Sequence, residues 1–115
     1  MTSPPDEIRK ELARLAGRSQ TRQAKFSRQA PCDWRPQQVI DPRSGEPFTP
    51  EGAWEFIVEQ IEGGAEIDVL LLEKPPGKKG YVLKLQGAEG EPTIYVKLQI
   101  MSGYVLARSF HYSRR

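Results

Sequence analysis

The last third of the chain alternates apolar and polar residues with the period of two that is typical of a β-strand with one buried face. In residues 93–101 the apolar positions are Ile94, Val96, Leu98 and Ile100. A second alternating segment, residues 104–113, follows after only Ser102 and Gly103. So short a connection predicts a tight hairpin, with Gly103 at a turn position that needs a positive φ.

Pairing Met101 with Tyr104 across this turn predicts the register of the hairpin. On the face predicted to be buried, the pairs are Ile100 with Val105, Leu98 with Ala107, and Val96 with Ser109. On the other face, the pairs are Gln99 with Leu106, Lys97 with Arg108, and Tyr95 with Phe110. Two cations directly opposite each other repel, so Lys97 beside Arg108 favours an anionic ligand on this face. An ordinary solvated sheet face is the alternative interpretation.

Two helices are predicted ahead of these strands. The first combines Ser3 as a cap, Pro4 at the first helical position, apolar residues Ile8, Leu12 and Leu15 at helical spacing, and Gly17 as its end. Its apolar stripe is thin, so we expect it to dock weakly or to need a partner. The second begins with Thr49 as N-cap and Pro50, ends at Gly63, and should pack on the sheet through Trp54, Ile57, Val58 and Ile61.

Residues 67–73 and 81–86 are predicted to form two further strands. The segment 30–48 contains four prolines and is predicted to be irregular; Trp34 within it is expected to plug the edge of the core, with stacking on a base as the alternative. The predicted fold is therefore α+β, with a four-stranded, mainly antiparallel sheet, one helix packed on a face, and an N-terminal helix.

The predicted organisation has two parts. Residues 1–29 form an N-terminal helix and basic arm, and residues 30–115 form the α+β core domain. Because the apolar stripes that build the sheet and its helix lie beyond Thr49, we expect the core to fold without residues 1–29.

Composition narrows the class of protein. A chain of 115 residues can bury one core, and it has no apolar run near the ~20 residues of a membrane span. The lone Cys32 cannot form an internal disulfide and no apolar signal region is present, so the expected location is cytoplasmic, without a membrane partner. The net charge is only +2, but residues 1–35 hold eight Lys or Arg against four Asp or Glu.

The basic residues of the arm recur at intervals of three and four. They are Arg18, Arg22, Lys25 and Arg28. On a continuing helix this spacing would line one face with positive charge and indicate binding to a nucleic-acid backbone. A solvated charged arm is the alternative.

The hairpin of residues 94–111 resembles the terminal hairpin of MqsR-like toxins, relatives of the RelE-like messenger-RNA interferases of toxin–antitoxin systems, and the similarity extends more loosely back to Trp54. The resemblance implies a small sheet that cleaves RNA without a metal on its open face, and a cognate antitoxin as partner. The family's Tyr in the penultimate strand falls on Tyr95, and its basic residue after Ser-Phe falls on His111, where these toxins can carry Lys. Lys84 departs from the Gln that the family can place on the preceding strand, and the basic arm has no counterpart.

Metal-free RNA cleavage needs a base for the 2′-OH proton, cations for the phosphorane, and an acid for the 5′-oxygen. Histidine suits both proton roles near neutral pH. The predicted site is thus His111 for proton transfer, Lys97, Arg108 and Lys84 for the phosphorane, and Tyr95 or Tyr112 to orient or stack the base. Strict alternation puts His111 on the Ile94 face, so it joins the site only through a β-bulge or at a fraying strand end. A structural histidine is the alternative.

Other chemistries find no support in the sequence. Cys32 and His111 are each alone, and no glycine-rich phosphate loop follows a strand, so neither a metal site, a hydrolase triad nor a cofactor is predicted. The first hypothesis is a metal-independent endoribonuclease toxin with RNA as substrate. The alternatives are a non-catalytic nucleic-acid-binding module and a protein-binding partner or immunity protein.

Overall fold

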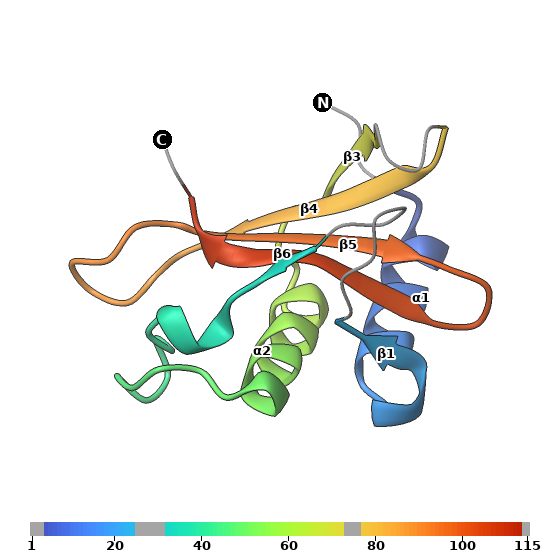
Figure 1. Cartoon of the computed structure of the whole chain (residues 1–115). Coiled ribbons are helices and arrows are strands. Elements are labelled where there is room, and N and C mark those ends of the chain that lie inside the picture. The colour runs from blue at the N-terminus through green and yellow to red at the C-terminus, as the bar shows by residue number, and fades with distance from the viewer. Residues whose placement is uncertain (1–3, 25–31, 73–76, 114–115) are drawn as a thin grey trace.

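The computed structural model describes residues 4–24, 32–72 and 77–113, where two α-helices lie on one side of a β-sheet (Figure 1). Helix α1 spans Asp6–Ala16 and α2 spans Pro50–Glu62, with short 3₁₀ helices at Ser19–Thr21 and Pro36–Gln38. The strands are β1 (Arg22–Gln23), β2 (Asp33–Trp34), β3 (Asp68–Leu71), β4 (Lys79–Leu85), β5 (Ile94–Ile100) and β6 (Val105–Tyr112).

The sheet runs in the order β1-β6-β5-β4-β3, and β2 also pairs with β6. Strands β3 to β6 form the predicted antiparallel series, whereas β1 and β2 pair with β6 in parallel. The α+β class is confirmed, but the sheet has six strands and is mixed, not four-stranded. Because β1 and β2 have two residues each, they are too short to show an alternating pattern in the sequence.

Helix α2 begins as predicted. The Thr49 hydroxyl accepts a hydrogen bond from the Gly52 N–H at 2.9 Å, and Pro50 occupies the first turn, where a missing N–H costs nothing. The buried face of the helix joins the core that also contains the inward side chains of β4, β5 and β6. Its buried residues are Ala53, Trp54, Phe56, Ile57 and Ile61.

Helix α1 is a full part of this core, and the expectation of weak docking is wrong. Leu12, Leu15 and Ala16 are at most 1% exposed and belong to the same apolar cluster as α2. Arg9 adds a polar contact, because its Nη1 donates a hydrogen bond to the Ile61 carbonyl at 2.8 Å near the end of α2. A thin stripe is therefore enough to pack one face of α1 against the core, and the core includes residues well before Thr49.

The predicted basic arm does not continue α1 as a helix. Gly17 ends α1, and the chain passes through a 3₁₀ turn into β1. The Arg22 side chain makes two contacts on the helix side of the sheet. Its Nη1 donates a hydrogen bond to the Ala16 carbonyl at 2.9 Å, and its guanidinium carbon lies 5.7 Å from the centroid of the Trp54 ring. Arg18 and Arg22 therefore do not share a helical face, while Lys25 and Arg28 lie outside the described residues.

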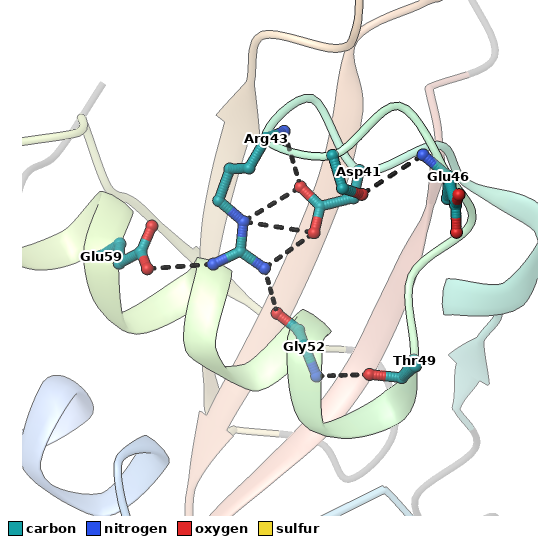
Figure 2. A network of polar contacts seen from close by, with 7 residues as sticks. Asp41, Arg43, Glu46, Thr49, Gly52 and Glu59 are labelled. Atoms are coloured by element: carbon teal, nitrogen blue, oxygen red, sulfur yellow. Dashed lines mark hydrogen bonds and ion pairs between the residues drawn. The ribbon is translucent and has the colours of Figure 1, made fainter.

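A polar network fixes the loop ahead of α2 (Figure 2). The buried Asp41 carboxylate accepts hydrogen bonds from the Arg43 backbone N–H at 2.8 Å and from the Arg43 guanidinium at 2.8 to 3.2 Å. The same guanidinium donates to Glu59 and to the Gly52 carbonyl on α2. Burial raises the pKa of Asp41, but the hydrogen bonds and the charge of Arg43 outweigh it, so the pKa lies below the ordinary value. The loop is thus tied to α2 through one arginine.

Candidate functional site

A β-bulge in β6 sets the geometry of the hairpin. The register is as predicted from the Ile100–Val105 pair to the Leu98–Ala107 pair, and then shifts so that Ser109 faces Lys97. Arg108 is the extra residue that the bulge inserts between the two registers, so the predicted Lys97–Arg108 pair is wrong. The Val96–Ser109 and Tyr95–Phe110 pairs are wrong for the same reason: Val96 faces Phe110, and Tyr95 faces His111.

The bulge carries His111 to the face on which Tyr95 lies. Tyr95 pairs with Lys84 on β4 and with His111 on β6, so the three side chains form a row across three strands. The adjacent row, Leu83, Val96 and Phe110, is buried in the core beneath the helices. By the alternation of strands, Lys84, Tyr95 and His111 therefore lie on the opposite surface of the sheet, which we call the open face. This surface is accessible along their row, whereas Val82, Gln99, Leu106 and Ser109 on the same surface are buried.

Tyr95 and His111 are in direct contact on the open face. Their ring centroids are 5.4 Å apart and their planes are inclined by only 19°. Burial raises the pKa of the Tyr95 phenol, so the hydroxyl stays protonated at neutral pH and can donate a hydrogen bond.

The two ring nitrogens of His111 have different surroundings. Nδ1 lies 2.8 Å from the Tyr112 carbonyl oxygen. A carbonyl only accepts, so this contact puts a proton on Nδ1 and leaves Nε2 as the nitrogen that gains or loses a proton. Nε2 lies 3.6 Å from the Asp33 Oδ2 atom, and the other carboxylate oxygen of Asp33 accepts a hydrogen bond from Arg35 Nε.

Strand β2 delivers Asp33 to this position. Its parallel pairing with β6 places Asp33 beside Ser109 and Trp34 beside Phe110, and the Trp34 ring packs against Phe110 and Trp54 on the core side. Trp34 was predicted at the edge of the core, whereas Asp33 and Arg35 were missed. The one available signal was that these two charges flank an aromatic residue with period two, over a span too short to indicate a strand.

Two cavities open beside His111. The first, which we call the Tyr95 pocket, has a volume of about 290 Å³ and is lined by Asp33, Tyr95, His111 and Ser113. The second, the Arg35 pocket, has a volume of about 200 Å³ and is lined by Arg35, Gln38, Val39, His111, Tyr112 and Ser113. His111 and Ser113 line both pockets.

The predicted cations differ in accessibility. Lys84 is exposed and Lys97 is half-buried, whereas Arg108 is only 5% exposed and its Nη1 donates to Gln99 Oε1 at 2.7 Å. The prediction that Arg108 lies exposed beside Lys97 is therefore wrong. The two charges still interact, because burial and then the positive charge of Arg108 lower the pKa of Lys97. Arg108 therefore adds positive charge near the open face, but its buried side chain offers little surface for contact with a ligand.

The structure places Tyr112 away from the open face. It pairs with Ile94, packs against the core cluster, and its hydroxyl accepts a hydrogen bond from the Ile40 backbone N–H at 2.9 Å. Burial raises the pKa of this phenol, although the Ile40 contact opposes the shift. Tyr112 thus holds the segment that follows β2. The predicted site residues that do share the open face are Tyr95, His111, Lys97 and Lys84.

No membrane-spanning helix and no metal-binding cluster is found among the described residues, and comparisons with known proteins found no match. In the described part of the chain, no helix is long and apolar enough to cross a membrane, and no cluster of three or more His, Cys, Asp or Glu side chains could hold a metal ion. No protein-family model, no curated protein and no solved structure matches this chain.

Proposed function

We propose that this protein is a metal-independent endoribonuclease that cleaves RNA on the open face of its sheet. The observation that carries the proposal is the contact between Tyr95 and His111, with Lys84 in the same row and Asp33 beside Nε2 of the imidazole. An aromatic platform, a proton-transfer group and nearby cations are the parts that this reaction requires.

In the proposed reaction the 2′-oxygen of the substrate attacks phosphorus and the bond from phosphorus to the 5′-oxygen breaks. His111 Nε2 takes the 2′-OH proton, and the departing 5′-oxygen takes a proton from solvent water, so the products are a 2′,3′-cyclic phosphate and a free 5′-hydroxyl. The imidazolium then returns its proton to solvent. The contact of Nδ1 with the Tyr112 carbonyl supports this role, because it holds the ring with Nε2 toward the Asp33 carboxylate. Asp33 is well placed to stabilise the imidazolium that forms.

Lys97 is the cation that we assign to the phosphorane. It lies two residues from Tyr95 on the same face of β5 and is partly desolvated, and a partly desolvated charge interacts more strongly with a developing anion than an exposed one does. Lys84, at the exposed end of the Tyr95 row, is assigned to a neighbouring phosphate.

The biological role proposed from the resemblance of the hairpin is that of a toxin in a toxin–antitoxin system, acting in the cytoplasm with a cognate antitoxin as partner. No cofactor is part of the proposed reaction. The structure supplies one feature to which such a protein partner could bind: strand β3 is at the end of the strand order, and its Leu71 side chain is 71% exposed.

Incubating the purified protein with labelled single-stranded RNA in EDTA tests the proposal. We expect cleavage by the wild type, loss of cleavage in the His111→Gln variant, and none with DNA of the same sequence, which has no 2′-OH. Lys10→Ala is the control, because Lys10 is exposed on α1, on the side of the sheet opposite the open face. Equal cleavage by the wild type and the His111→Gln variant would point to a contaminating nuclease and contradict the proposal.

A non-catalytic nucleic-acid-binding module is the second candidate. The observation in its favour is the Asp33 carboxylate near Nε2, which can serve as a purely structural ion pair with a protonated His111. Both candidates expect the Lys84→Ala, Lys97→Ala double variant to flatten the salt dependence of RNA binding, by about 0.7 in slope for each single-strand phosphate that the variant no longer neutralises. RNA binding that depends on these lysines without cleavage in EDTA would decide for the second candidate.

A further inference from the structure

We propose that the Tyr95 pocket and the Arg35 pocket are successive subsites for one RNA strand, with a base in the Tyr95 pocket and the sugar-phosphate of the adjoining nucleotide in the Arg35 pocket. This inference rests on the proposed ribonuclease function and assigns Arg35 and Gln38 to substrate binding. Neither residue follows from the sequence pattern or from the resemblance of the hairpin.

The two pockets share a wall. His111 and Ser113 line both cavities, so a ligand that fills both must pass the imidazole. A nuclease that cuts within a chain has to hold nucleotides on both sides of the phosphate that it attacks. Two cavities that meet at the proton-transfer residue satisfy this requirement.

The Tyr95 pocket suits a base and not a phosphate. Tyr95 contributes a partly exposed aromatic ring, on which a base can stack. Asp33 puts a carboxylate in the same wall, which repels a phosphate but accepts hydrogen bonds from the N–H groups of a base. The volume of about 290 Å³ lies just below the range for pockets that bind drug-sized molecules, as expected for a ligand of the size of one base.

The Arg35 pocket has the opposite character. None of the described residues that line it is acidic, and Arg35 brings a side chain that is 50% exposed. The contact with Asp33 uses Nε and orients the guanidinium, which presents its donors in the planar fork that binds phosphate oxygens well. Gln38 adds an amide that can donate to a phosphate or accept from a ribose hydroxyl.

Binding of short 2′-deoxy oligonucleotides, which cannot be cleaved, tests the subsites independently of catalysis. We expect the trinucleotide to bind more tightly than the dinucleotide in an NMR titration of the full chain. The ratio of the dinucleotide Kd to the trinucleotide Kd should be about tenfold lower in the Arg35→Gln variant, which is the effect expected of one charge-assisted hydrogen bond. Arg14→Gln is the matched control, because Arg14 is 53% exposed and also paired with a carboxylate, Glu11, but lies on α1. It should leave the ratio unchanged.

The outcomes separate the two proposals. A ratio of one in the wild type, or the same ratio in the Arg35→Gln variant as in the wild type, would overturn the subsites even if the protein cleaves RNA. A ratio that depends on Arg35, without cleavage of the matching RNA trinucleotide in EDTA, would support the subsites and remove the ribonuclease proposal on which they were built.

Discussion

The imidazole of His111 stacks on the phenol ring of Tyr95, although the two residues come from adjacent strands and were expected on opposite faces of the sheet. The stacked phenol ring limits the rotation of the imidazole about its Cβ–Cγ bond. Together with the Nδ1 contact to the Tyr112 carbonyl, the stack fixes where Nε2 lies. In the proposed reaction, a proton-transfer group that is already oriented would need no reorganisation on binding of RNA.

We expect the His111→Ala variant to cleave RNA about 10² to 10⁴ times more slowly than the wild type while its affinity for RNA barely changes, because proton transfer acts in the transition state and not in binding. Single-turnover rates and equilibrium binding, measured on the same preparations, give the two quantities. A variant that is less stable but cleaves normally while folded would identify His111 as structural.

Replacing Lys97 with methionine should stabilise the fold and weaken RNA binding at the same time. Burial and the charge of Arg108 hold the pKa of Lys97 below its ordinary value, so the folded state disfavours the protonated lysine. This penalty is present below the folded pKa and disappears as pH rises through it toward the unfolded value of about 10.4. We expect the Lys97→Met variant to melt roughly 1 to 4 °C higher at pH 7, with the difference shrinking as the pH rises toward the unfolded pKa of about 10.4.

The control for this experiment is Lys84→Met, on the same face but exposed. It should weaken RNA binding without raising the melting temperature. Equal melting temperatures for the wild type and the Lys97→Met variant would mean that the protonated Lys97 does not destabilise the folded state.

The Asp41→Asn variant should show where the loop ahead of α2 derives its stability. Because the pKa of Asp41 is lowered in the folded state, the contribution of its contact with Arg43 is fully present above the unfolded pKa of about 3.9 and is lost as pH falls through the folded value. We expect the variant to lose roughly 1 to 3 kcal/mol of unfolding free energy at pH 7. Denaturant unfolding at several pH values should show this difference narrowing below pH ~4; a constant difference would contradict the ionic origin.

Leu12→Ala tests whether α1 belongs to the core. Leu12 is 0% exposed, so its truncation should leave a cavity and cost about 2 to 5 kcal/mol. Ile8→Ala, at a partly buried position on the same helix, should cost less. Unchanged stability in the Leu12→Ala variant would restore the expectation of a core that folds without the N-terminal helix.

Long, regular patterns allowed most of the fold to be predicted from the sequence. Helix α2 has 13 residues and β5 has seven, so each repeats its apolar period several times. A single residue that departs from the pattern does not hide such a period. The two-residue strands β1 and β2 carry no such signal, because they are held by pairing with β6 and not by their own composition.

The candidate site was predicted in part for the same reason. Tyr95, Lys97 and Lys84 follow from alternation along β5 and β4, and they lie on one face as expected. Asp33 and Arg35 depend on a parallel pairing between segments more than seventy residues apart in the chain, which local patterns do not encode. Arg108 was misplaced because it is itself the extra residue of the bulge, and that residue changes the face of every later position of the strand.

The irregularity in β6 has an origin in the core. Ala107 and Phe110 are both 0% exposed on the helix side, yet they are three residues apart, an odd spacing that a regular strand cannot place on one face. The strand satisfies both by taking Arg108 out of the alternation, and His111 moves with Phe110. The odd spacing between the buried residues Ala107 and Phe110 thus determines on which face of the sheet His111 lies. A substitution at Phe110, which is itself 0% exposed, could therefore alter the chemistry of the opposite surface of the sheet.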